Sequence, residues 1–244
     1  MNQPDLGEQA ISKAAEIGIE NQLDEVEDLQ VDVRANPLDL IGGKLESVTI
    51  DGKGMVMKKE LRAERLILQT DAIAINAVKA ALGNIELTQD TNAEAKIVLL
   101  EADLQQAFNS EYIKGKLQNQ QLDLNGETVT VNASNVKFAL PGEGKINLEA
   151  DIEIAESQTT KHIALSAKPT LDADGNKIAI ADVEYHDAEN AAFAQALLDS
   201  VKELLDLRNF ELDAVSLKIN KLDVTQGKII MAASAVISEF PDSQ

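Results

Sequence analysis

The sequence predicts an α+β fold in which a long, strongly curved antiparallel β-sheet wraps around one or two apolar-faced helices. Residues 145–154 alternate strictly between apolar and polar side chains, which is typical of antiparallel strands with one buried face. The alternation slips phase after Ala133 and again after Ile219, and each slip requires a bulge that bends the strand. The segments 101–119 and 188–206 carry apolar stripes at helical spacing, and a bent sheet can enclose such helices.

The composition bounds both the fold and the partners. The 244 residues suit a single domain spanning 1–244, and 44% of them are apolar, as in ordinary folded proteins. Only 3% are aromatic and none is Trp, so the core must be built from aliphatic side chains. The 42 acidic and 22 basic residues give a net charge of −20, which repels phosphate backbones and argues against a nucleic-acid partner. The absence of Cys excludes disulfides, thiolate nucleophiles and iron–sulfur clusters.

The first part of the chain is predicted to form a helix followed by a β region. Residues 1–22 hold an N-terminal amphipathic helix, because apolar side chains recur at helical spacing over 5–20. In the β region 23–100, Pro37 ends a strand that begins near Leu29, and Asp51-Gly52 is a hairpin signal. Residues 72–83 fit either a helix or a loop. Further strands are expected at about 44–50, 55–58, 61–70 and 85–89, followed by an apolar segment at 95–100.

The rest of the chain is predicted to alternate between helices and antiparallel strands. Apolar side chains four residues apart mark the first of these helices, and turn residues separate the strands. The predicted order is a helix at 101–119, an antiparallel β region at 127–186 with turns at 141–144 and 174–176, a helix at 188–206, and terminal strands within 210–240.

The sequence contains none of the common catalytic motifs. It has no GxSxG, P-loop, GxGxxG or HExxH pattern, so we expect a protein that is not an enzyme. His162 and His186 lie far apart in strand-like segments, and we interpret both as bystanders. Residues 172–176 resemble the start of a calcium loop but lack its terminal Glu, which favours a hairpin turn. We therefore predict no metal site and no cofactor.

One basic stretch contrasts with the acidic remainder of the chain. Residues 53–65 hold five basic and two acidic side chains around Met55-Val56-Met57. An apolar tip flanked by lysines can enter a lipid surface, whereas the alternative is an edge strand whose Met side chains belong to the core. The candidates for membrane docking are Lys53, Met55, Met57, Lys58, Lys59, Arg62 and Arg65.

The apolar stripes of the two later helices are core by default, but they also suit a lipid groove. Bent strands around aliphatic helices, with few aromatic rings to fill space, leave an interior that an acyl chain can enter. Each buried CH₂ group contributes ~0.8 kcal/mol, so a chain of about sixteen carbons gains on the order of 10 kcal/mol before ordering costs. The candidate groove residues are Leu104, Phe108, Tyr112, Phe193, Leu197, Val201 and Leu204.

Several runs of the chain are similar to a known family. They read Leu-Gln-Val-Asp-Val from Leu29, Pro-Leu-Asp-Leu-Ile-Gly-Gly-Lys-Leu-Glu-Ser-Val-Thr-Ile from Pro37, Gly-Lys-Gly from Gly52 and Leu-Arg-Ala-Glu-Arg-Leu-Ile-Leu from Leu61. In these motifs the chain resembles the bacterial LmeA-like phospholipid-binding family, where a strand, a leucine-leucine-glycine turn and a V-x-I strand occur in this order. The run Leu-Leu-Glu-Ala-Asp-Leu from Leu99 is similar to the family's L-T-E-x-D-L entry into a helix, with Glu101-Ala in place of Thr-Glu.

The resemblance implies a fold and a class of ligand. The fold is the tubular lipid-binding (BPI-like) type, a coiled antiparallel sheet around a long helix, and no catalytic residue carries over. We expect non-enzymatic binding of phospholipid or another acyl-chain lipid in an apolar groove, with lipid carriage or presentation at a membrane and transient contact with its surface. The alternative is a ligand-free structural or interaction protein whose acidic surface binds a basic protein partner.

Localisation is predicted from the absence of recognisable targeting segments. The first residues have neither a basic n-region nor an apolar h-region, and no run approaches the ~18 apolar residues that span a bilayer. The chain as given is expected to be cytoplasmic or peripheral to a membrane, or on the envelope side if a leader was removed.

Overall fold

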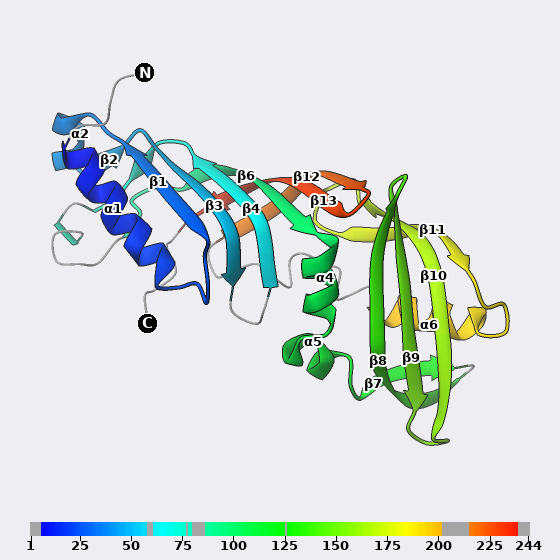
Figure 1. The fold of residues 1–244 in the computed structure, drawn as a ribbon. Helices are drawn as coiled ribbons and strands as arrows, with labels where there is room; N and C mark the ends of the chain where they lie inside the picture. Colours follow the sequence, from blue (N-terminus) through cyan, green and yellow to red (C-terminus); the bar gives the residue numbers. More distant parts are fainter. Residues whose placement is uncertain are drawn as a thin grey trace.

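The computed structural model describes residues 6–57, 61–76, 78–79, 86–124, 126–201 and 215–238. Its strands form two large antiparallel sheets and one small one, arranged along an elongated molecule (Figure 1). The six-stranded sheet has the order β1 (Asp28–Arg34), β3 (Ser47–Met57), β4 (Leu61–Thr70), β6 (Thr91–Leu100), β13 (Lys228–Ile237) and β12 (Val215–Thr225). The five-stranded sheet has the order β11 (Ile178–Tyr185), β10 (Thr159–Leu171), β9 (Lys145–Ile154), β8 (Glu127–Gly142) and β7 (Gln120–Leu124). The third sheet pairs β2 (Lys44–Leu45) with β5 (Ile73–Ala74).

The helices lie at the ends of the sheets and between them. In Figure 1, α1 and α2 flank the six-stranded sheet at one end of the molecule, α4 and α5 lie between the two large sheets, and α6 lies against the five-stranded sheet. The prediction of an α+β fold with a strongly curved antiparallel sheet is confirmed. The curved sheet is divided in two, which the sequence did not indicate. The helix bounds are α1 (Leu6–Glu20), α2 (Pro37–Ile41), α4 (Glu101–Phe108), α5 (Glu111–Lys116) and α6 (Ala191–Val201).

Both predicted phase slips coincide with bulges. The register between β8 and β9 shifts between Ser134 and Lys137, and that between β12 and β13 shifts between Ile219 and Lys221. Each strand therefore keeps its apolar side chains on one face although the alternation changes parity. In β12, Ile219 and Val224 are both buried as a result.

Three local predictions were wrong. No strand forms over 86–89, where Leu87 makes only an isolated bridge to Ile75. Asp51-Gly52 is not a hairpin but lies inside β3, where Gly52 pairs with Leu29 on one side and with Leu66 on the other. Gly52 is needed for packing instead, because a Cβ there would lie 2.2 Å from the Met55 Sδ. The predicted helix 101–119 is two helices, since α4 ends before Asn109 and Ser110 caps α5 by accepting a hydrogen bond from the Ile113 N–H.

The five-stranded sheet has a sealed core. Phe193 and Ala194 of α6 pack into its apolar face together with half-buried Leu197. The strand residues in this cluster are Leu122, Val131, Val136, Ala150, Ile152, Ile154 and Ile163, each at most 8% exposed.

The α4 helix joins the two large sheets by covering an edge of β8. β7 pairs with β8 only as far as Val131. Beyond it, Gln105 accepts from the Phe138 N–H at 2.7 Å and donates to the Val136 carbonyl at 2.9 Å, while Glu101 accepts from the Leu140 N–H. These side chains replace a neighbouring strand, which leaves this part of the edge unavailable for pairing with another chain.

Candidate functional site

The register of the six-stranded sheet places one side chain from each strand in rows across a single face. One such row is Val31, Ile50, Leu68, Ala95, Ala233 and Ile219, and the next is Leu29, Gly52, Leu66, Ile97, Met231 and Leu222. The opposite face carries mostly polar residues, among them Asp51, Arg65, Lys96, Ser234 and Lys218. The sheet therefore has one apolar and one polar face.

The middle of this apolar face is only half-buried. Large aliphatic side chains at the centre of a sheet are normally sealed, as Ile152 and Ile163 are in the five-stranded sheet, at 1% and 2% exposed. The six-stranded sheet is sealed near α1, where Leu29, Val31 and Val33 pack against half-buried Ile11, Ala15 and Ile19. Its half-buried stretch, which we call the apolar face, comprises Ile50, Leu66, Leu68, Ala95, Ile97, Leu99, Leu222, Ile229 and Met231.

Helices bound the apolar face on two sides. α1 packs on β1 and β3, and α4 contacts β4 and β6. Ser12 and Glu8 of α1 accept hydrogen bonds from the Val33 and Ala35 N–H groups at 3.0 and 2.9 Å. They cover the edge of β1 much as α4 covers β8.

A buried hydroxyl lies at the end of the same face that is closer to α2. Thr91 pairs with Ile237 and is 2% exposed, and its Oγ1 has no hydrogen-bond partner among the described residues. Thr70, also buried, accepts from the Val48 N–H at 3.0 Å. An unpaired buried hydroxyl costs about 1–3 kcal/mol.

Two of the predicted groove residues, Leu104 and Phe108, lie where the apolar face ends, in a packed cluster that includes Leu222 and Ile229. Leu104 and Phe108 pack with Phe138 and Leu140 where the two sheets meet, and the Phe108 and Phe138 rings stack at 5.3 Å. Phe108 also contacts the cluster that holds Phe193.

The other candidate groove residues on the helices differ in whether they contact these clusters. Tyr112 is half-buried on α5, with the Lys116 ammonium 5.8 Å from its ring. Leu197 packs against the Phe193 cluster, Val201 ends α6, and Leu204 lies outside the described residues. The structure therefore brings Leu104, Phe108, Phe193 and Leu197 into one continuous interior.

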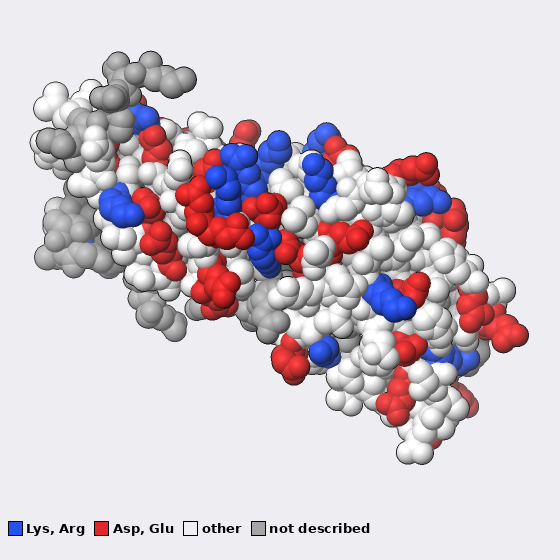
Figure 2. Space-filling model, viewed as in Figure 1, with Lys and Arg blue, Asp and Glu red and all other residues white. Residues whose placement is uncertain are grey.

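The described basic side chains of the stretch, Lys53, Arg62 and Arg65, form ion pairs with neighbouring carboxylates. Figure 2 shows Lys and Arg side chains over β3 and β4 interspersed with Asp and Glu. The Arg62 guanidinium bonds Glu27, Glu64 and Asp103 at 2.6, 3.0 and 2.8 Å, which raises the pKa of Arg62. Arg62 lies on β4, Asp103 on α4 and Glu27 just before β1, so these ion pairs connect the three parts of the chain.

The remaining docking candidates are paired, buried or outside the described residues. Lys53 bonds Asp28 at 2.8 Å, and Arg65 bonds Asp51 at 2.8 Å, which lowers the pKa of Asp51. Met55 is 4% exposed, which agrees with the alternative interpretation that its side chain belongs to the core. Met57 is the last residue of β3. Lys58 and Lys59 lie outside the described residues. Docking through this stretch stays a prediction.

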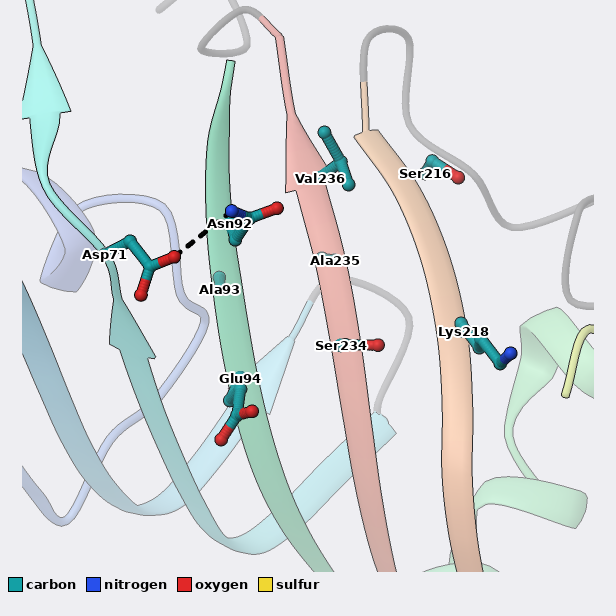
Figure 3. A pocket seen from close by; sticks show the side chains of 9 residues that line it. All are labelled: Asp71, Asn92, Ala93, Glu94, Ser216, Lys218, Ser234, Ala235 and Val236. Carbon is teal, nitrogen blue, oxygen red and sulfur yellow. Dashed lines mark hydrogen bonds between the residues drawn. The ribbon is translucent and has the colours of Figure 1, made fainter.

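A shallow hollow lies on the polar face of the six-stranded sheet. Its volume is about 450 Å³, and Glu94, Ser216, Lys218, Ser234 and Val236 contribute to its lining (Figure 3). Asn92 donates to Asp71 at its rim at 3.1 Å. It opens on the face opposite the apolar face, so it is a separate feature.

The two histidines make hydrogen bonds within the five-stranded sheet. His162 Nδ1 lies 2.9 Å from Asp151 Oδ1, and His186 Nε2 lies 2.9 Å from Ser166 Oγ. Ser166 donates its single proton to Asn147, so the imidazole donates to the hydroxyl instead of activating it. Among the described residues, no cluster of three metal-ligating side chains is found.

The described elements form an α+β protein with curved antiparallel sheets, one of which has a half-buried apolar face. Its sequence matches the LmeA-like phospholipid-binding family over residues 4–234, so the chain belongs to that family. Comparisons with curated proteins and with solved structures give no match. No helix in the described part of the chain is both long and apolar enough to cross a bilayer.

The predicted groove lies on the helices, and the strand residues of the apolar face are not among its candidates. The signal was present in the strands: Leu66 and Leu68, Ile97 and Leu99, and Ile229 and Met231 are each two residues apart. Such pairs mark a buried strand face, but they do not say whether protein or ligand covers it.

Proposed function

We propose that the protein binds phospholipid non-enzymatically by laying acyl chains along the apolar face of the six-stranded sheet. The observation that carries the proposal is the contrast between the two large sheets. Both have a continuous aliphatic face; α6 covers that of the five-stranded sheet, whereas α1 covers only one end of that of the six-stranded sheet and the described residues leave its middle half-buried. Membership of a phospholipid-binding family supports a lipid as the missing cover.

The dimensions and energetics suit an acyl chain. The apolar face runs about 13 Å along β6, from Ala95 to Leu99, and about 19 Å across the strands from β3 to β12, so it can cover a large part of an extended acyl chain. Completing the burial of half-exposed aliphatic side chains is favourable at about 25 cal/mol per Å² of apolar area. The tails then provide most of the affinity, and polar groups near the ends of the face select the headgroup. We propose that the bound lipid is carried or presented at a membrane surface.

The proposal is tested by native mass spectrometry of detergent-free protein after incubation with phosphatidylcholine vesicles. We expect a stoichiometric phospholipid adduct on the wild-type protein. Met231→Gln places an amide in the middle of the apolar face and should weaken lipid binding about tenfold, since one buried Met side chain contributes about 1.5–3 kcal/mol.

Ile230→Gln is the matched control, because Ile230 is the next residue of β13 and lies on the polar face. It should leave the adduct unchanged. Equal loss in both variants would contradict binding at this face. Protein that stays free of lipid would favour the alternative, a ligand-free protein that binds a basic partner through its acidic surface.

A further inference from the structure

The most exposed large apolar side chains gather at one end of the molecule. Among the described residues, five large apolar side chains are exposed: Leu38 at 81%, Ile41 at 79%, Val78 at 74%, Ile17 at 48% and Val236 at 39%. The first two lie on α2, and Val78 follows β5, which pairs with the β2 strand that comes directly after α2. Soluble proteins rarely concentrate such exposure without a binding role.

The exposure of Leu38 and Ile41 is built into α2. Asn36 caps the helix by accepting from the Leu38 N–H, and Pro37 occupies its first turn. The chain leaves at Gly43, whose φ is +76° and whose carbonyl accepts from the Ile75 N–H at 2.8 Å. Leu38 and Ile41 are three residues apart and share one side of the helix, while Leu40 is half-buried.

The position of α2 connects this tip to the apolar face. β1 ends at Arg34, and the adjacent Val33 and Val48 pair belongs to the same side of the sheet as the apolar face. Thr70 and Thr91, both buried, lie at this end of the sheet. A lipid lying along the apolar face with its polar end here would have its headgroup beside the α2 tip.

We propose that Leu38 and Ile41 of α2 insert into the surface of a lipid bilayer and bring the end of the apolar face to the membrane. This inference rests on the proposed lipid binding. The occupant is a bilayer rather than a protein because the chain belongs to a phospholipid-binding family and because the two exposed side chains of α2 are aliphatic. Asp39 and the net charge of −20 make neutral lipid the preferred surface. Such a surface gains from apolar insertion into neutral lipid and is repelled by anionic lipid.

The tip lies at the opposite end of the six-stranded sheet from the basic stretch. β3 begins at Ser47, close to α2 in the chain, and ends at Met57 within the basic stretch. The two candidate docking surfaces are therefore separated by the length of a strand of about 35 Å, and they can be tested independently.

The absence of Trp from the chain provides a direct test. Leu38→Trp introduces a single indole, and we expect its emission to shift to the blue with phosphatidylcholine vesicles and to be quenched by brominated acyl chains. Ile17→Trp, at an exposed position on α1, is the control and should show neither effect. Adding anionic lipid to the vesicles should weaken the shift.

A loss-of-function variant separates this inference from the proposed function. Leu38→Gln/Ile41→Gln should lower vesicle association about tenfold or more, while uptake of a short-chain phosphatidylcholine below its micellar concentration stays unchanged. Vesicle association equal to that of the wild type, or an indole at position 38 that stays in water, would overturn the inference alone. A wild-type protein that takes up no short-chain lipid would overturn the proposed function.

Discussion

At the scale of single residues, Gly52 and Met55 form a tightly coupled pair. We predict that Gly52→Ala destabilises the protein by about 1–3 kcal/mol, because the added Cβ would overlap the Sδ of Met55, which is 4% exposed and has little room to move. In a Met55→Ala background the same substitution should be neutral or stabilising, since Ala is otherwise better than Gly in a strand. Urea unfolding of the four proteins measures this coupling. Equal effects of Gly52→Ala in both backgrounds would show that Met55 does not restrict position 52.

A second residue-scale prediction concerns Asp51. The Arg65 guanidinium donates to both carboxylate oxygens, at 3.1 and 2.8 Å, which holds the pKa of Asp51 below its usual value. Because the folded-state pKa is the lower one, the pair stabilises the protein fully above the unfolded-state pKa of Asp51, and this contribution is lost as the pH falls through the folded-state pKa. Arg65→Gln should therefore raise the Asp51 pKa toward its ordinary range, as followed by carboxyl NMR titration. An unchanged titration would mean that the ion pair does not persist in solution.

At the scale of elements, helices close the sheet edges with side chains. We predict that Gln105→Ala destabilises the protein by about 1–3 kcal/mol. The substitution removes the side-chain acceptor of the Phe138 N–H and one of the donors to the Val136 carbonyl on β8. Gln106→Ala is the control, since Gln106 is exposed on the same helix. Thermal unfolding compares the two variants. Equal stability of both would show that β8 does not depend on α4 for its edge.

Elements were predictable where the pattern is local. The bulges in β8 and β12 could be placed from sequence, because a change of parity in the apolar alternation has no other simple cause. The hairpin at Asp51-Gly52 could not be excluded, because a glycine that makes room for Met55 is indistinguishable from a turn glycine in one dimension. The break between α4 and α5 depends on Ser110, which caps the second helix. Its signal was present but weaker than the apolar stripe that continues through it.

At the scale of the whole molecule, the division into two sheets and the position of the site depend on long-range pairing. β6 and β13 lie side by side although residues 91–100 and 228–237 are far apart in the chain. The sequence patterns of β9 and β13 both indicate a buried face, and only the position of α6 decides that the first is sealed by protein. The family resemblance pointed to the class of ligand, while the surface that we propose for it could be recognised only from the three-dimensional arrangement.

The most direct test of the central claim is photo-crosslinking with a phosphatidylcholine that carries a diazirine in its acyl chain, followed by peptide mapping. The account predicts that the label attaches to β4, β6, β13 and β12, at residues of the apolar face such as Leu68, Ile97 and Met231. Labelling concentrated on α6 and the strands around Phe193 would place the lipid in the five-stranded sheet and contradict the account. An absence of specific labelling would contradict lipid binding at either sheet.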